Sequence, residues 1–331
     1  FFFVVEMAVA LRRLMCTRPA LGWGCRFGSR LYSTASEVQP EQALLDLEPV
    51  AFIGGGKMAE AIVGGILDTH SLEPQSICIS DPDPKRRQFF ETAKGVRTAE
   101  SNLEAVQDAK LVVFCNKPQH CERIFNECKG KLHSDSVVLS ICAGVTTVAF
   151  QRGLNHERII RAMPNTPAMV HGAMSVWYPT PEVTKAQQEG VALFLQTFGE
   201  QEKLTDEEYL DMATALSGTG PAYFFLLIET LVDAGVHMGF PRNTAEKLVR
   251  QTALGSSMYA SKFHHIHPTQ LRNDITSPGG TTAAALYAAE RGNFRNVVTD
   301  AVWAAYERSK ILGEASNSIV TSGHTHNNKP K

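Results

Sequence analysis

Several features that mark other protein classes are missing from this sequence. No apolar run approaches the roughly 20 residues that a membrane-spanning helix needs, so we expect no membrane segment. A net charge of −2 over 331 residues leaves no basic excess of the kind that binds nucleic acid. The seven cysteines form no Cys-x-x-Cys pair, which favours reduced intracellular thiols over a disulfide framework. No Ser/His/Asp or Cys/His signature of a nucleophilic enzyme is evident either.

The beginning of the chain lacks acidic residues. Between Met7 and Ser36 there is no Asp or Glu, while arginines punctuate apolar and hydroxyl residues at Arg12, Arg13, Arg18, Arg26 and Arg30. This composition is typical of a mitochondrial transit peptide, with a plastid as second choice. Arg18 and Arg26 interrupt the apolar stretch that a secretory signal would need. We therefore expect residues 1–46 to be an N-terminal extension with a mitochondrial transit peptide.

The rest of the chain is organised around a glycine-rich turn. The short apolar run Val50–Ile53 has the composition of a buried parallel strand, and it leads directly into Gly54-Gly55-Gly56 and a helix-forming segment. In this context Gly54, Gly56 and Ala59 match G-x-G-x-x-A, the dinucleotide-binding fingerprint. Gly54 permits the tight turn, and Gly56 lets the backbone approach a pyrophosphate at the helix N-terminus.

Further strand-like runs alternate with helical segments after this turn. The expected strands are Ser76–Ser80, Leu111–Cys115, Val137–Ile141, Arg158–Ala162 and an edge strand at Glu202–Leu204, which follows a helix at Glu182–Thr197. This alternation predicts an α/β Rossmann-type doubly wound sheet over residues 47–207. The length of 331 residues agrees with two domains.

Polar residues follow the carboxyl ends of these strands, where a doubly wound sheet binds its ligands. Asp81 stands where an acid accepts a hydrogen bond from the adenosine ribose and disfavours a 2′-phosphate. The cations of residues 85–87 could instead pair with that phosphate, so the choice between NADPH and NADH stays open. The next two strands end in Asn116-Lys117-Pro118 and Cys142-Ala143-Gly144-Val145.

The second half of the chain has a helical pattern. Pro221–Met238 is apolar almost all round, which is typical of a helix buried in a large core or between subunits. Residues 276–282, Thr-Ser-Pro-Gly-Gly-Thr-Thr, precede a helical run at Ala283–Glu290 and form a nest of N–H donors suited to a carboxylate. A simple N-cap by Ser277 or Thr281 is the alternative. We expect an all-α domain over residues 208–316 and a disordered polar tail over residues 317–331.

Six segments together resemble one family. They are Phe52–Ala59 (FIGGGKMA), Lys117-Pro118, Ala143-Gly144-Val145, Met163–Pro167 (MPNTP), Leu216–Tyr223 (LSGTGPAY), and His267-Pro268 leading to Asp274 and Thr276–Thr282. Over about residues 49–313 the chain resembles pyrroline-5-carboxylate reductases, which make proline in the last step of its biosynthesis. The glycine fingerprint is shared by many dehydrogenases, whereas the last two segments are signatures of this family.

The resemblance implies a function and a set of site residues. It implies NADPH- or NADH-dependent reduction of 1-pyrroline-5-carboxylate to L-proline by an N-terminal Rossmann domain and an all-helical dimerisation domain. The resemblance also implies a homodimer, and in this family such dimers are often assembled into decamers. We expect neither nucleic acid nor a membrane as a partner. The implied catalytic residue is Thr282, whose hydroxyl binds the ring nitrogen. The substrate residues are Ser277, Gly279, Gly280, Thr281 and Thr282. The cofactor residues are Gly54, Gly56, Lys57, Met58, Asp81, Asn102, Asn116, Lys117, Pro118, Ala143 and Gly144.

The sequence departs from the family pattern at a few positions. Asn116 stands where a small or apolar residue is usual, and Ala215 stands where glycine is usual. Some members also carry an acid near His265. No metal is expected, because His264, His265 and His267 crowd one loop without a Cys or carboxylate at ligand spacing.

Two other functions are compatible with parts of the pattern. A β-hydroxyacid dehydrogenase also joins a Rossmann domain to a helical dimer domain, but it needs a catalytic lysine. Lys247 is the candidate here, and its neighbours offer no accompanying signature. A non-catalytic dinucleotide sensor would keep residues 50–62 but would have no reason to keep the nest at residues 276–282.

Overall fold

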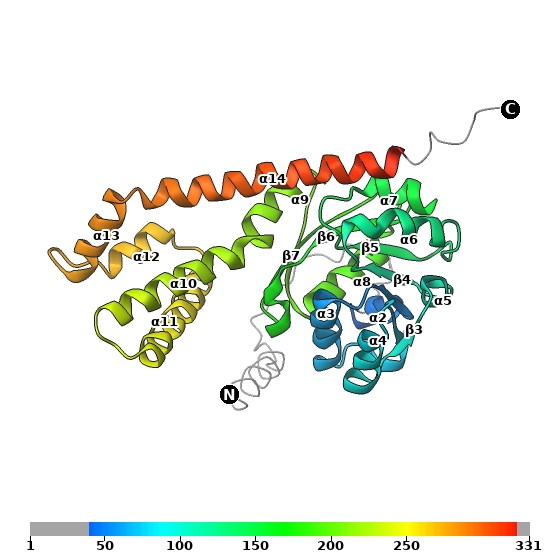
Figure 1. Ribbon diagram of the computed structural model, residues 1–331, viewed down its shortest axis with the longest axis horizontal. Helices are drawn as coiled ribbons and strands as arrows, with labels where there is room; N and C mark the ends of the chain where they lie inside the picture. Colours follow the sequence, from blue (N-terminus) through cyan, green and yellow to red (C-terminus); the bar gives the residue numbers. More distant parts are fainter. Residues whose placement is uncertain (1–39, 323–331) are drawn as a thin grey trace, which may run out of the picture. The chain divides into compact units, whose positions relative to one another are not determined.

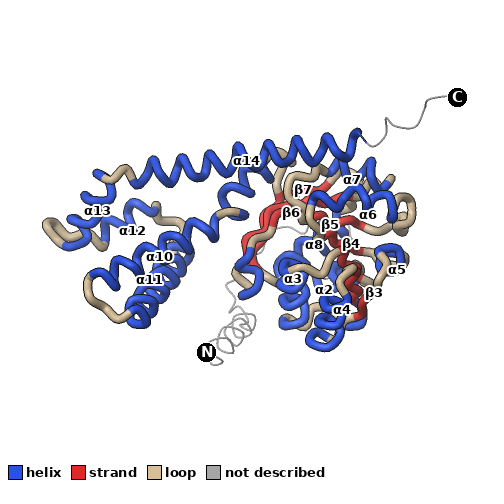
Figure 2. Tube along the Cα trace, viewed as in Figure 1, coloured by secondary structure: helices blue, strands red, loops and turns tan. Residues whose placement is uncertain are grey.

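A computed structural model of the chain describes residues 40–322, in which strands are confined to the first part and the second part is helical (Figures 1 and 2). The predicted transit peptide lies outside the described residues. The strands are β1 (Val50–Ile53), β2 (Ile77–Ser80), β3 (Arg97–Ala99), β4 (Leu111–Phe114), β5 (Val137–Ser140), β6 (Ile159–Met163), β7 (Ala173–Pro179) and β8 (Gly199–Lys203). They form one sheet in the order β3-β2-β1-β4-β5-β6-β7-β8. All neighbouring pairs are parallel except β6 and β7, so the predicted doubly wound sheet is confirmed.

Helices cover both faces of the sheet because alternate strand residues point to opposite sides. From β1, Val50 and Phe52 join one core, and Ala51 and Ile53 join the other. The first core includes residues of α3 (Lys57–Asp68) and α8 (Lys185–Gln196), and the second includes residues of α5 (Asn102–Val106), α6 (Cys121–Cys128) and α7 (Thr147–Leu154). The short helix α4 (Pro84–Phe89) follows β2. The glycine turn therefore emerges at the edge of a fully packed layer.

The fold begins earlier in the chain than expected. Residues 40–46 were assigned to the N-terminal extension, but Pro40–Leu45 form helix α2, which packs against α8. Ala43 and Leu44 are buried, and the carbonyl oxygen of Ala43 lies against Gly190, where a Cβ would come within 2.4 Å of it. The apolar residues of this short segment complete the core under α8, which is why it joins the sheet domain.

Two strands were missed, and one helix is longer than expected. β3 is a three-residue strand without an apolar run, and β7 is the antiparallel strand beside β6. The C-terminal helix α14 runs from Phe294 to Ser322, so residues 317–322 of the expected disordered tail are helical. No Pro or Gly interrupts residues 314–322, and extending an existing helix costs little once it is nucleated.

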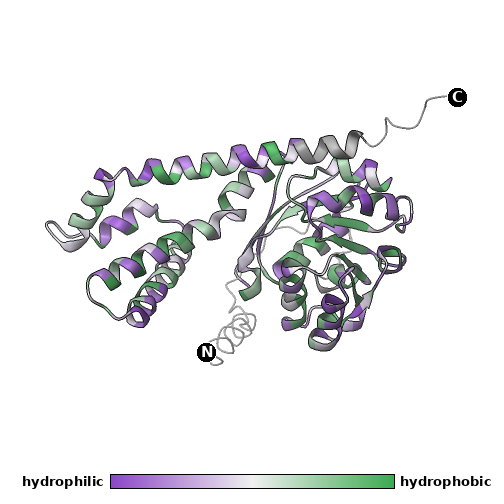
Figure 3. Cartoon of the chain, in the orientation of Figure 1, coloured by the Kyte–Doolittle hydropathy of each residue, from purple (hydrophilic) through white to green (hydrophobic). Residues whose placement is uncertain are grey.

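The helical half contains α9 (Tyr209–Ala213), α10 (Gly220–His237), α11 (Arg242–Lys262), α12 (Pro268–Asp274), α13 (Thr281–Arg291) and α14. Among residues 214–314 the buried hydrophobic side chains are Ala215, Val232 and Ala245. Large apolar side chains are exposed instead, among them Leu216, Phe224, Phe225, Leu226, Leu254, Met258, Tyr287 and Trp303. Figure 3 shows apolar residues along α10. By length and composition alone, the helical stretch Tyr209–His237 could cross a membrane, so the expectation that no apolar run approaches this length is wrong for it. A helix of this kind needs a partner surface, which residues 40–322 of one copy do not supply.

Polar contacts join the sheet domain to the beginning of the helical half. Arg161 on β6 is buried and pairs with Glu207 (3.1 Å) and Asp211 (3.2 Å), and the backbone N–H of Thr147 also donates to Glu207. Asn165, in the Pro-Asn-Thr-Pro segment that follows β6, donates to the carbonyl oxygen of Ser217 (2.9 Å) and accepts from the N–H of Met174. The turn residue thus holds the end of β6 against the start of the helical half.

Candidate functional site

The glycine turn after β1 brings three strand ends together. Gly54 has a φ of +98°, and its N–H donates to the carbonyl oxygen of Ser80 at 2.7 Å. A Cβ on Gly54 would lie 3.1 Å from the backbone nitrogen of Asn116. Glycine is required here both by the backbone conformation and by the close approach of β4.

Asp81 braces this turn from the end of β2. Its Oδ2 accepts from the N–H of Gly55 at 2.7 Å, and its Oδ1 accepts from the N–H of Asp83 at 2.8 Å. On the other side of the turn, Arg86 Nε donates to the carbonyl oxygen of Gly55 at 2.6 Å. Asp81 therefore shapes the turn in addition to the ribose contact expected of it, which stays a prediction.

The N-terminus of α3 is open to a ligand. Gly56 is the N-cap residue, no side chain caps the helix, and a Cβ built on Gly56 meets nothing within 4 Å. The first backbone N–H groups of α3 are therefore free of a side-chain cap, which suits a pyrophosphate. Lys57 is largely exposed and pairs with Glu60 on its own helix.

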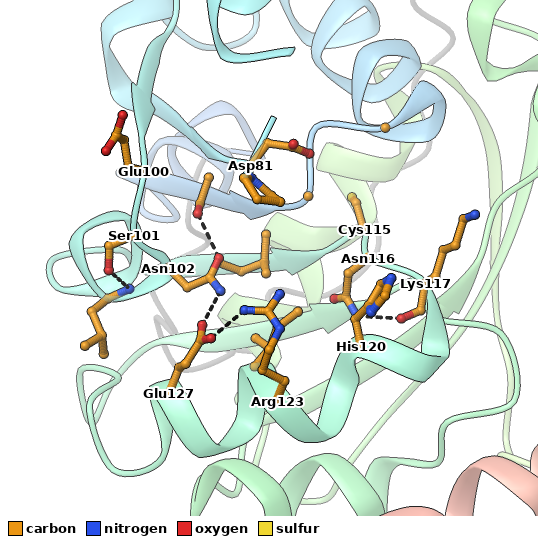
Figure 4. A pocket seen from close by; sticks show the side chains of 17 residues that line it. Asp81, Glu100, Ser101, Asn102, Cys115, Asn116, Lys117, His120, Arg123 and Glu127 are labelled. Atoms are coloured by element: carbon orange, nitrogen blue, oxygen red, sulfur yellow. Dashed lines mark hydrogen bonds and ion pairs between the residues drawn. The ribbon is translucent and has the colours of Figure 1, made fainter. Parts of the chain in front are cut away.

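A cavity of about 590 Å³ opens in front of the turn (Figure 4). Six of the predicted cofactor residues line it: Gly54, Gly56, Asp81, Asn102, Asn116 and Lys117. Its other lining residues are Ile53, Ser80, Pro82, Glu100, Ser101, Leu103, Cys115, His120, Arg123, Ile124 and Glu127. The cavity lies at the ends of β1, β2 and β4, where β1 is paired with β2 on one side and β4 on the other, which is the switch point of a doubly wound sheet.

A chain of hydrogen bonds crosses one wall of the cavity. Ser80 Oγ donates to Asn102 Oδ1 at 2.8 Å, and Asn102 Nδ2 donates to Glu127 Oε2 at 2.6 Å (Figure 4). Glu127 also pairs with Arg123, one turn earlier on α6. Ser80, Arg123 and Glu127 are not among the residues expected at the site, although the i,i+4 spacing of Arg123 and Glu127 predicts their pairing.

Three cysteines lie close to Asn116 at the cavity. Asn116 Nδ2 contacts Cys121 Sγ at 3.3 Å, and Cys142 Sγ donates to the carbonyl oxygen of Asn116 at 3.2 Å. Cys115 lines the cavity, and burial raises the pKa of its thiol far above the ordinary range. A protonated thiol is a poor nucleophile, so Cys115 supplies no thiolate to the cavity, and the contacts of Cys121 and Cys142 position Asn116.

Five predicted cofactor residues do not line this cavity: Lys57, Met58, Pro118, Ala143 and Gly144. Gly144 has a φ of +75°, and a Cβ there would lie 3.1 Å from the Cα of Gly313 on α14. In the described chain this glycine therefore accommodates a close approach between the loop after β5 and α14. A cofactor role for these five residues stays a prediction.

The predicted carboxylate nest forms the loop between α12 and α13. Gly279 has a φ of +70°, and the N–H of Gly280 donates to the carbonyl oxygen of Ser277 at 3.1 Å. Gly280 is the N-cap of α13 without a side-chain cap, so capping by Ser277 or Thr281 is not observed. The cavity at the glycine turn is lined only by residues between 53 and 127. One copy of the chain therefore does not place Thr282 in that cavity.

The loop histidines do not form a metal site. His267 Nδ1 accepts from the N–H of Thr269 at 3.2 Å and so caps α12. Within residues 40–322 no group of three or more His, Cys, Asp or Glu side chains could hold a metal ion.

Comparison with known proteins places the chain in a family. Residues 207–312 match the family profile described as pyrroline-5-carboxylate reductase dimerisation, and residues 49–144 match the profile of NADP oxidoreductase, coenzyme F420-dependent. The chain is 40% identical to pyrroline-5-carboxylate reductase of Arabidopsis thaliana over 80% of this chain and 96% of the relative. The chain belongs to the pyrroline-5-carboxylate reductase family.

Solved structures agree with this assignment. A pyrroline-5-carboxylate reductase from Coxiella burnetii is 35% identical with a TM-score of 0.75, covering 80% of this chain and 98% of that chain. Plasmodium falciparum pyrroline carboxylate reductase with NADP bound is 31% identical with a TM-score of 0.73, over the same shares of the two chains. The Rossmann-type sheet and the helical dimerisation domain expected from the sequence are therefore confirmed.

Proposed function

We propose that the chain reduces the C=N bond of 1-pyrroline-5-carboxylate with NADPH or NADH and so forms L-proline. One observation carries the proposal: the same chain has two helix N-termini without a side-chain cap. One is that of α3 at the glycine turn, and the other is that of α13 at the nest inside the dimerisation domain of this family. A dinucleotide-binding cavity alone would fit many dehydrogenases. The second site supplies a place for a small carboxylate substrate.

The residues around the cavity fit a nicotinamide dinucleotide. The space at Gly56 and the uncapped start of α3 suit the pyrophosphate, and Asp81 and Asn102 lie where the adenosine ribose is bound in this fold. Asn116 and Lys117 follow β4 and line the cavity, and in our proposal they meet the nicotinamide half. When bound, the reduced dinucleotide supplies a hydride to the imine carbon.

The protein contributes binding and polarisation to this reaction. In our proposal the N–H groups of residues 279–282 and the hydroxyl of Ser277 hold the substrate carboxylate. The hydroxyl of Thr282 hydrogen-bonds the ring nitrogen while the adjacent carbon accepts the hydride. A proton from solvent completes the amine, so no side chain needs to act as a nucleophile.

We also propose that the working unit is at least a homodimer, assembled into a decamer. The exposed apolar face of α10 and the match to the dimerisation profile support a second copy as the partner of this face, rather than a membrane. In such a dimer the nest of one copy could complete the cavity of the other. Light scattering after size exclusion, in the absence of detergent, tests the size. A monomer, or a chain that dissolves only in detergent, would contradict the proposal.

The location is a separate proposal. The composition of residues 7–36 supports import into the mitochondrion, with a plastid as second choice. A C-terminal fluorescent fusion of the whole sequence should accumulate in mitochondria, whereas the same fusion without residues 1–36 should not. Equal distribution of the two fusions would contradict a transit peptide.

One assay tests the activity. The purified full chain should oxidise NADPH or NADH only when 1-pyrroline-5-carboxylate is added, with proline as the product. A β-hydroxyacid dehydrogenase would instead reduce NAD(P)⁺ with a β-hydroxyacid, and its activity would depend on Lys247, which lies exposed on α11 outside the cavity. A dinucleotide sensor would bind the cofactor and turn over neither substrate.

A further inference from the structure

The end of the cavity formed by β2 and β3 is acidic. The cavity is lined there by residues 80–82 and 100–103, and their charged members are Asp81 and Glu100. Lys117 and Arg123 line it from the segment after β4 and from α6, on another side of the cavity (Figure 4). In dinucleotide-binding sheets the residues after β2 meet the adenosine ribose, and an acid there opposes a 2′-phosphate.

The carboxylate of Asp81 cannot readily turn away. Two backbone N–H groups, those of Gly55 and Asp83, each donate to one of its oxygens. A carboxylate has about four acceptor positions, so it can still accept a bond from a ribose hydroxyl. A 2′-phosphate at the same place would meet a negative charge that the backbone holds in position.

Two of the three cations after β2 do not line the cavity, and one of them is held by other groups. Arg86 donates to the carbonyl oxygen of Gly55 and pairs with Glu60 at 3.0 Å, and its guanidinium lies over the rings of Phe89 and Phe90. Neither Arg86 nor Lys85 lines the cavity. The sequence pattern that left NADPH open therefore does not place these two cations at the ribose end.

Arg87 is the remaining cation, and Glu100 holds it. Its Nη2 pairs with Glu100 Oε1 at 2.5 Å, and its Nη1 donates to the carbonyl oxygens of Asp81 and Pro82. Its side chain is only 15% exposed, against 83% for Glu100. Arg87 does not itself line the cavity, but all three of its partners, Asp81, Pro82 and Glu100, do. The two carbonyl bonds therefore hold the guanidinium next to the ribose end, and its Nη2 is paired with Glu100.

We propose that this chain binds NADH in preference to NADPH, and that Glu100 sets the preference by neutralising Arg87 and presenting a second carboxylate beside Asp81. The proposal rests on the function proposed above and names which of the two dinucleotides the site takes. Glu100 thus determines cofactor specificity in a chain whose relative from Plasmodium falciparum has been solved with NADP bound.

The test measures binding rather than turnover. NADH and NADPH are titrated separately into the full chain at one fixed ionic strength, and their dissociation constants are read by isothermal titration calorimetry. The wild-type chain should bind NADH at least tenfold more tightly. In Glu100→Gln the ratio of the two constants should shift by tenfold or more toward NADPH, because Arg87 becomes available to the 2′-phosphate. The affinity for NADH should change less than threefold.

Two further variants keep the result specific. Glu189→Gln removes the same charge from an exposed position on α8 that lines neither the cavity nor the hollow shared by Arg87 and Glu100, and it should leave the ratio unchanged. Glu100→Gln combined with Arg87→Gln should lose the gain in NADPH affinity. Thermal melts of all variants identify any that fail to fold, and Glu100→Ala then replaces Glu100→Gln.

The outcomes separate the two proposals. A wild-type chain that binds neither dinucleotide overturns the proposed function and this preference with it. A wild-type chain that binds both dinucleotides but prefers NADPH, or binds them equally, overturns only the preference. A Glu100→Gln chain whose two affinities change together overturns the role of Glu100.

Discussion

Two glycines of the same turn should respond differently to an added side chain. At Gly54 the backbone has a φ of +98°, and a Cβ would lie 3.1–3.2 Å from backbone atoms of Asn116 and Cys115. At Gly56 the φ is −73°, and a Cβ meets nothing within 4 Å. We expect Gly54→Ala to destabilise the protein and Gly56→Val to damage only cofactor binding.

The size of each effect follows from these geometries. An alanine at a strained positive φ costs about 1–3 kcal/mol, and the backbone contacts at Gly54 add to this cost. Each kcal/mol lowers Tm by roughly 2–4 °C in a domain of 150–250 residues, so a drop of several degrees is expected. For Gly56→Val, the poorer N-cap lowers the free energy of unfolding by about 1 kcal/mol. Valine also reduces the conformational entropy of the unfolded chain, which raises the free energy of unfolding by about 0.4–1 kcal/mol. The valine methyl groups instead occupy space assigned to the pyrophosphate, and a tenfold loss of affinity corresponds to about 1.4 kcal/mol.

Thermal melts and dinucleotide titrations of the two variants make the comparison. Gly54→Ala should melt early, and Gly56→Val should melt within about 3 °C of the wild-type chain but bind the cofactor at least tenfold more weakly. Gly56→Ala is the matched control, because its single methyl group should disturb both measurements less. A Gly56→Val protein with unchanged cofactor affinity would remove this turn from the binding site and refute the reasoning.

Three further predictions concern other parts of the molecule. Thr282→Ala should reduce kcat/KM by roughly tenfold to a hundredfold, and kcat with it, because the lost hydrogen bond strengthens as the nitrogen changes charge; steady-state kinetics should show a smaller loss for Thr282→Ser. Arg161→Met should lower the free energy of unfolding in urea by about 3 kcal/mol, because it leaves two half-buried carboxylates without their cation, whereas Arg158→Met breaks an exposed pair and should cost under about 1 kcal/mol. Burial lowers the pKa of His156 below its ordinary 6.5, so the unfolded chain binds the proton more readily than the folded chain does. Stability should therefore fall as the pH drops through 6.5. In thermal melts across that range, a His156→Gln variant should lose less stability.

The sheet could be predicted wherever strands are apolar and continuous. β1, β4 and β5 are buried along their whole length, so, apart from Ser140 at the end of β5, their residues form unbroken hydrophobic runs. β3 has only three residues, begins with Arg97 and is buried at Ala99 alone, so its place in the sheet depends on pairing with β2. Such a strand has no local signal. β7, by contrast, carries Val176, Trp177 and Tyr178, and this β-branched and aromatic run could have indicated it.

The glycine turn and the nest could be predicted from the sequence, but the hydrogen bonds and ion pairs around them could not. The glycine turn and the nest have local signatures, because turns and helix starts demand particular residues at fixed spacing. The bond from Asp81 to Gly55 spans 26 residues, and the pair between Arg87 and Glu100 spans 13. Neither could be read from local spacing, since both depend on how neighbouring strands are arranged. This is why the cations after β2 looked available for a phosphate.

Because the apolar helices are uncovered in one subunit, the stability of the helical half depends on the protein concentration. The sheet domain has complete cores of its own, so it can fold on each chain as synthesis proceeds from the N-terminus. The helical half, with side chains such as Phe225 and Leu254 exposed, gains its packing only when another subunit arrives. Its stability is therefore set by mass action and falls on dilution, while that of the sheet domain does not. The helical half of a newly made subunit therefore stays incompletely packed until the subunit associates with another. This waiting time shortens as the concentration of subunits rises.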